Sequence, residues 1–146
     1  MSRISKQPSV SASVSGSPVQ RFLSRLALVQ GLYYFVTGVW PLVDIDSFQA
    51  VTGPKTDLWL VRTVGALIVA IAMALLAADW QRQINLAVWI LAVGSAAALT
   101  AIDILYVSLG VIDKIYLADA AAELVLIACW CAWAYNRKGI FTGSPR

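Results

Sequence analysis

Four long apolar runs constrain this chain more than any other feature of its sequence. They cover residues 26–43, 58–78, 84–106 and 116–135. An α-helix rises about 1.5 Å per residue, so each run is long enough to cross the hydrocarbon core of a bilayer. Hydrophobic residues make up 60% of the chain and charged residues 13%, against roughly 45–50% and 25% in soluble domains. We therefore predict an all-α, polytopic membrane protein.

The links between the apolar runs are short and polar. The longest, residues 44–57, contains a Gly53-Pro54 turn signal. Short links join antiparallel neighbours, so we expect an up-down bundle of four transmembrane helices over residues 21–136. Residues 1–20 contain seven Ser and no acid, and they are expected to form a flexible tail. Residues 137–146 are expected to form a second, shorter tail.

Basic residues near the ends of the spans predict the orientation of the bundle. Eight of the 11 lie on one side: Arg3, Lys6, Arg21, Arg25, Arg82, Arg137, Lys138 and Arg146. Lys55 and Lys114 lie on the other side, and Arg62 lies within the second span. Cytoplasmic flanks carry the excess of Lys and Arg, so both termini and both tails are expected in the cytoplasm. We expect a multi-pass protein of the bacterial inner membrane, although the Arg- and Ser-rich start also resembles an organelle transit peptide.

Polar side chains recur at one depth in all four spans. Aromatic residues typical of a membrane interface mark the outer boundary: Trp40, Trp59, Tyr106 and Tyr116. Three residues inward, about 4.5 Å by helix rise, each span carries a polar residue: Thr37, Arg62, Asp103 and Asp119. Tyr33 and Glu123 lie seven residues inward, about 10 Å deep. Charged groups facing lipid are costly, so we expect these side chains to converge inside the bundle.

This polar layer allows two interpretations. In the first it is a structural clip, in which Arg62 bridges the acids of neighbouring spans. In the second it is an outward-facing pocket for a cation, a proton or a polar ligand head, since intramembrane ionisable groups are functional candidates by default. The candidate ligand-binding residues are Arg62, Asp103, Asp119, Glu123, Tyr33 and Thr37.

Several kinds of chemistry find no support in the sequence. The chain has no His, which removes the commonest general base and metal ligand. Cys129 and Cys131 point to opposite sides of a helix and lack the C-x-x-C spacing of thiol oxidoreductases. No nucleotide-binding fingerprint or nucleic-acid patch occurs. We therefore assign no catalytic or metal-binding residue, expect no nucleic-acid partner, and leave any cofactor unassigned.

The first span carries a family resemblance. Residues 25–31 (RLALVQG) and 32–38 (LYYFVTG) combine a basic residue, an apolar stretch and two glycines seven apart, with Thr37 before the second. This pattern resembles the opening of DoxX-like bacterial membrane proteins, which are also small and have four spans. The resemblance implies an inner-membrane protein, sometimes an accessory subunit linked with redox enzymes or quinone metabolism.

These observations favour a non-enzymatic role. The chain is expected to bind or sense a small amphiphile or cation in an acidic intramembrane pocket, or to act as an accessory subunit of a membrane complex. Two alternatives stay open: a quinone-linked component of a membrane oxidoreductase, and a subunit of a proton- or cation-coupled transporter. The expected partners are the lipid bilayer, a small amphiphile, quinone or cation, and further copies of the chain or a larger membrane complex.

Overall fold

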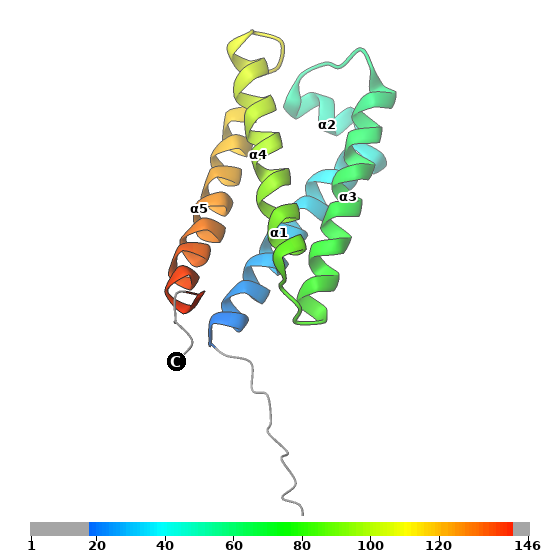
Figure 1. The fold of residues 1–146 in the computed structure, drawn as a ribbon. Coiled ribbons are helices and arrows are strands. Elements are labelled where there is room, and N and C mark those ends of the chain that lie inside the picture. Colours follow the sequence, from blue (N-terminus) through cyan, green and yellow to red (C-terminus); the bar gives the residue numbers. More distant parts are fainter. Residues whose placement is uncertain (1–17, 142–146) are drawn as a thin grey trace, which may run out of the picture.

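The computed structural model describes residues 18–141, which form helices and the links between them, with no strand among them. The five helices are α1 (Pro18–Val43), α2 (Ile45–Thr52), α3 (Leu58–Trp80), α4 (Leu86–Ser108) and α5 (Tyr116–Phe141) (Figure 1). Four stretches are long and apolar enough to cross a membrane: Arg21–Val43, Leu58–Trp80, Leu86–Ser108 and Tyr116–Tyr135. The predicted all-α, polytopic bundle is thus confirmed.

The tails predicted from the sequence fall largely outside the described residues. Residues 1–17 and 142–146 are not described. Residues 18–20 begin α1, with Pro18 at its first position, where the missing backbone N–H is not needed. Residues 137–141 continue α5.

The long helices pack as two antiparallel pairs, α1 with α3 and α4 with α5. Glycine allows the first pair to approach closely. A Cβ atom added to Gly38 of α1 would lie 2.8 Å from the carbonyl oxygen of Gly65 of α3, and one added to Gly65 would lie 2.7 Å from the carbonyl oxygen of Gly38. Such small-residue contacts are typical of packed transmembrane helices. The two pairs touch each other less extensively than their own members do.

The two ends of the bundle differ. The start of α1 and the end of α5 lie at the same end, which we call the termini end, and α2 lies at the opposite end, the α2 end (Figure 1). Between the pairs, the half toward the termini end is filled by buried side chains: Leu23, Leu26, Ala27, Ala72, Leu75, Ala92, Leu126 and Trp130. Many large apolar side chains on the outer faces are exposed, as expected for surfaces that contact lipid.

Helix α2 forms within the stretch that the sequence indicated only as a polar link. Asp44 caps its first turn by accepting a hydrogen bond from the backbone N–H of Ser47, at 3.0 Å. This bond, together with one from the Ser47 side chain, holds the pKa of the Asp44 carboxyl below its usual range. The helix stops before Gly53, whose φ of +85° favours glycine. Phe48 packs edge-on against Trp40 of α1, with 5.6 Å between ring centroids, which fixes α2 to the end of the bundle.

Candidate functional site

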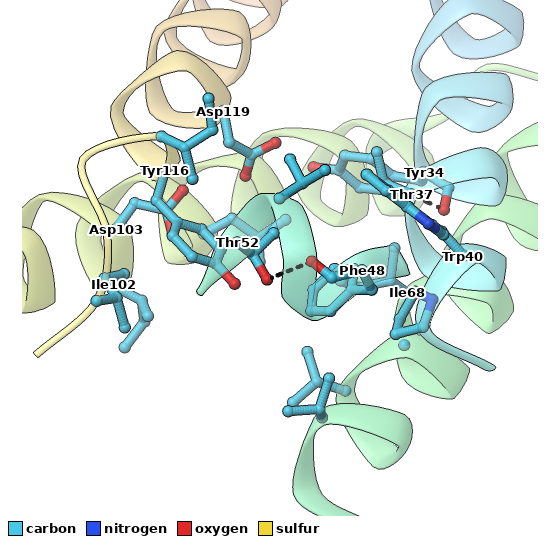
Figure 2. Close-up of a pocket in the computed structure, with 18 of the residues that line it drawn as sticks. Tyr34, Thr37, Trp40, Phe48, Thr52, Ile68, Ile102, Asp103, Tyr116 and Asp119 are labelled. Atoms are coloured by element: carbon cyan, nitrogen blue, oxygen red, sulfur yellow. Dashed lines mark hydrogen bonds between the residues drawn. The ribbon is translucent and has the colours of Figure 1, made fainter. Parts of the chain in front are cut away.

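A cavity of about 410 Å³ lies between the two helix pairs in the half toward the α2 end. Its walls come from all five helices and from the α4–α5 loop (Figure 2). Most of the lining is apolar, for example Phe48, Val61, Ile68 and Ile112. Helix α2 contributes Phe48, Val51 and Thr52, so this short helix covers part of the cavity.

Three carboxyl groups gather on the α4 and α5 side of this cavity. Asp103 comes from α4, and Asp119 and Glu123 come from α5, one helical turn apart on the same face. Asp103 and Asp119 are direct neighbours across the α4–α5 contact. The lining residues include no Lys and no Arg. The cavity therefore joins an apolar chamber to a locally acidic wall.

Two of these carboxyl groups have an oxygen atom with no hydrogen-bond partner. Glu123 is 0% exposed; its Oε2 accepts a hydrogen bond from the Tyr34 hydroxyl at 2.9 Å, and its Oε1 has no partner. Asp103 is 5% exposed, and its Oδ2 has no partner. Buried polar atoms are nearly always hydrogen-bonded, so each exception requires an explanation.

Tyrosine side chains of α1 reach across to α5. Tyr34 donates to Glu123, and Tyr33 donates to Oδ1 of Asp119. The Thr37 hydroxyl donates to the backbone oxygen of Tyr33 at 2.9 Å, within its own helix. The two tyrosine contacts orient Asp119 and Glu123 of α5. The hydroxyl groups that α1 places near these acids are therefore already engaged as donors.

A buried polar group whose amide nitrogen and oxygen are both hydrogen-bonded lies one turn beyond the lining residue Tyr34. Gln30, one turn beyond Tyr34 on α1, is 0% exposed. Its Nε2 donates to the backbone oxygen of Ala92 at 2.9 Å, and its Oε1 accepts from the Trp130 indole N–H at 2.8 Å. Gln30 thereby joins α1 to both α4 and α5 just below the acidic wall.

The structure brings together most of the predicted ligand-binding residues. Thr37, Asp103, Asp119 and Glu123 line the cavity. Tyr33 lies behind this layer and contacts Asp119.

The expected position of Arg62 was wrong. Its side chain is exposed and does not line the cavity, and within residues 18–141 no ion pair joins it to the three acids. Its neighbour Val61 and, one turn on, Gly65 face the cavity instead. Arg62 lies one turn from the start of α3, so its long side chain can extend toward a membrane interface, which removes the need for an acidic partner. The clip interpretation requires the Arg62 cation to lie between the acids, so this position of Arg62 does not support it.

Some residues at the site were not among the sequence candidates. Tyr34 is the deepest α1 residue in the lining, and its spacing from Gln30 and Thr37 along one helical face was the available signal. Phe48 and Thr52 were missed because α2 was not expected. Its signals were the Asp44 cap and the Gly53-Pro54 stop on either side of an apolar face.

Lys55 is a basic side chain near the α2 end of the cavity. Its ammonium donates to the backbone oxygen of Thr52 at 2.7 Å and lies 5.1 Å from the ring centroid of Tyr116. Partial burial lowers the pKa of Lys55. The cation is thus engaged at the α2–α5 contact, where it connects the short helix to the cavity wall.

The acids do not form a metal-binding cluster. Within the described part of the chain, no three Cys, Asp or Glu side chains are grouped so that they could hold a metal ion. Comparisons with protein-family models, with curated protein sequences and with solved structures find no match for this chain. The functional conclusion therefore depends on the geometry of the site.

Proposed function

We propose that this chain is a non-enzymatic, membrane-embedded binding protein that takes up a small amphiphile in the cavity at the α2 end. The observation that carries this proposal is an apolar chamber with three carboxyl groups on one wall and two unpartnered carboxyl oxygens. An amphiphile matches both parts, because its apolar body contacts the walls while its polar head meets the acids.

The size of the cavity supports a small organic ligand. Pockets for small molecules are typically about 300–1,000 Å³, apolar in most of their lining, with a few polar groups that orient the ligand. The cavity, at about 410 Å³, lies in the lower part of this range. With the termini in the cytoplasm, as the basic residues predict, the cavity belongs to the outer half of the membrane.

The quinone alternative is less well supported by the hydrogen-bonding groups on offer. Quinone carbonyls accept hydrogen bonds, whereas the unpartnered atoms here are carboxyl oxygens. The hydroxyl of Tyr34 and the indole N–H of Trp40 already donate, to Glu123 and to Ser47, which leaves the hydroxyl of Tyr116 as the tyrosine donor in the lining. The acidic wall therefore suits a head group that donates.

The transporter alternative requires a path beyond the cavity. In a single copy, the hydrogen bonds of Gln30 and the buried residues toward the termini end block that path. A binding or sensing role, alone or as the accessory subunit of a larger membrane complex, requires no such opening. Membership of the DoxX-like group and residence in a bacterial inner membrane form part of the same proposal.

The experiment is native mass spectrometry of the protein purified in mild detergent, with a cavity-filling variant. Leu99→Trp places a larger side chain in the lining, whereas Ile104→Trp makes the same kind of change on the exposed face of α4. We expect a small molecule to remain bound to the wild type and to Ile104→Trp, and to be lost from Leu99→Trp. Equal retention by both variants would contradict binding in the cavity.

A further inference from the structure

The hydrogen bonds at the acidic wall leave acceptors without donors. Oε1 of Glu123 and Oδ2 of Asp103 have no partner, although both residues are more than nine-tenths buried and line the cavity. The hydroxyl groups of Tyr33 and Tyr34 already donate, to Asp119 and to the other oxygen of Glu123. The wall of this apolar chamber therefore contains two buried acceptors without donors.

The described part of the chain does not supply a cation to these acids. No Lys or Arg lines the cavity, Arg62 is exposed on α3, and Lys55 is engaged with Thr52 and Tyr116. A buried carboxylate is strongly unfavourable unless it is paired and hydrogen-bonded. A ligand that carries positive charge and several N–H groups would supply both the missing counter-charge and the missing hydrogen bonds.

The shape of the site favours an organic cation over a bare metal ion. No three acids of the described chain are grouped to hold a metal, and a hydrated ion gains nothing from apolar walls such as Phe48, Ile68 and Ile112. A primary ammonium has three N–H donors on one atom. It can therefore donate to separate acceptors while its apolar body fills the rest of the chamber.

We propose that the ligand of this cavity is an amphiphilic amine whose ammonium group donates to Glu123 Oε1 and Asp103 Oδ2. This proposal rests on the proposed function and names the class of ligand that the binding protein takes up. Asp119, held by Tyr33, adds negative charge beside the two acceptors.

The test compares three probes that share one phenylbutyl body and differ only in the head group: phenylbutylamine, phenylbutanol and phenylpentanoate. Binding to the wild type in nanodiscs is measured by calorimetry at pH 7, where an alkylamine is protonated. We expect the amine to bind at least about tenfold more tightly than the alcohol, because bonds to charged groups are the stronger ones. No binding is expected for the carboxylate.

A matched pair of variants tests whether the preference for the amine over the alcohol arises at the acidic wall of the cavity. Asp103→Asn removes one carboxylate from the wall, whereas Asp46→Asn makes the same change on the exposed face of α2. Asp103→Asn should weaken amine binding by about tenfold and leave alcohol binding nearly unchanged, and Asp46→Asn should affect neither.

The outcomes separate the two proposals. Equal affinity for amine and alcohol in the wild type would overturn the ammonium assignment and leave amphiphile binding standing. A failure of all three probes to bind would overturn the ammonium assignment. If nothing co-purifies with the protein either, the proposed function falls with it. The wild-type comparison decides the question even where a variant fails to fold.

Discussion

The interface between the α1–α3 pair and the α4–α5 pair has two halves, and they differ in how completely their buried polar groups are hydrogen-bonded. Toward the termini end, Gln30 has both its amide groups bonded, to the Ala92 carbonyl and to the Trp130 indole. Toward the α2 end, Glu123 and Asp103 each keep a buried oxygen without a partner. Gln30 and Glu123 both bond across from α1 to the α4–α5 pair.

The difference follows from what fills the space between the pairs. Toward the termini end, small residues such as Ala27, Ala72 and Ala92 let the helices pack around Trp130 and Gln30. Toward the α2 end the walls stand apart around the cavity, and α2 covers part of it. A buried polar group whose hydrogen bonds are all formed helps to specify the structure. A buried polar group that lacks a hydrogen bond lowers the stability of the fold, and a ligand can supply the missing bond. The first half is thus a structural contact, and the second is the proposed binding site.

The largest effect is expected from breaking the bonded half. Gln30→Ala leaves the buried Trp130 N–H unpaired and opens a void, which should lower stability by about 2–4 kcal/mol. Thermal unfolding in detergent measures the loss, with Gln83→Ala, at an exposed glutamine, as the matched control. A loss no larger than that of the control would mean that Gln30 does not hold the pairs together.

A smaller loss is expected from forcing α1 and α3 apart beside the cavity. In Gly38→Ala the new methyl group would meet the Gly65 carbonyl oxygen, an overpacked contact that should cost about 1–3 kcal/mol. Gly94→Ala is the control, because a Cβ there meets nothing within 4 Å. That change should be neutral or slightly stabilising, since alanine favours helices. Equal melting temperatures for the two variants would show that α1 and α3 do not approach closely at Gly38.

Arg62 tests whether the two halves really differ. If Arg62 were the counter-ion of the acids, the buried polar groups of both halves would have partners within the chain. Because its side chain is exposed, Arg62→Ala should change stability by no more than about 0.5 kcal/mol, and adding Asp119→Asn should rescue nothing. A large loss in Arg62→Ala that the second change recovers in a thermal unfolding experiment would restore the clip.

The smallest effect is expected in the helix that covers the cavity. Hydrogen bonds from Ser47 lower the pKa of Asp44 in the folded chain, so its capping contribution is present above about pH 4, the ordinary range of Asp. That contribution is lost as the pH falls through the lowered value. Amide hydrogen-exchange protection of α2 should therefore fall in acid in the wild type and much less in Asp44→Asn, which keeps a capping oxygen without a charge. The same decline in both proteins would mean that the cap does not control α2.

Depth along the helices could be predicted from the sequence, but rotation about their axes could not. Apolar length located all four spans, and three of the residues that the count from the interface aromatics assigned to one layer, Thr37, Asp103 and Asp119, line the cavity. The same count placed Arg62 at that depth, yet the direction of its side chain depends on how α3 packs against Gly38 of α1. The high cost of a charge in lipid suggested an inward position, although an arginine near a helix end avoids that cost by extending outward. The unpartnered oxygens appear only once the helices are assembled.

The most direct test of the account is the melting temperature of Glu123→Gln, with and without phenylbutylamine. Glutamine keeps an oxygen that accepts the Tyr34 hydroxyl and removes the charge that the ammonium is proposed to meet. We expect a ligand-free melting temperature close to that of the wild type and the loss of the stabilisation that the amine gives. A much lower ligand-free melting temperature, with the amine-induced shift retained, would show that Glu123 is structural and would contradict the account.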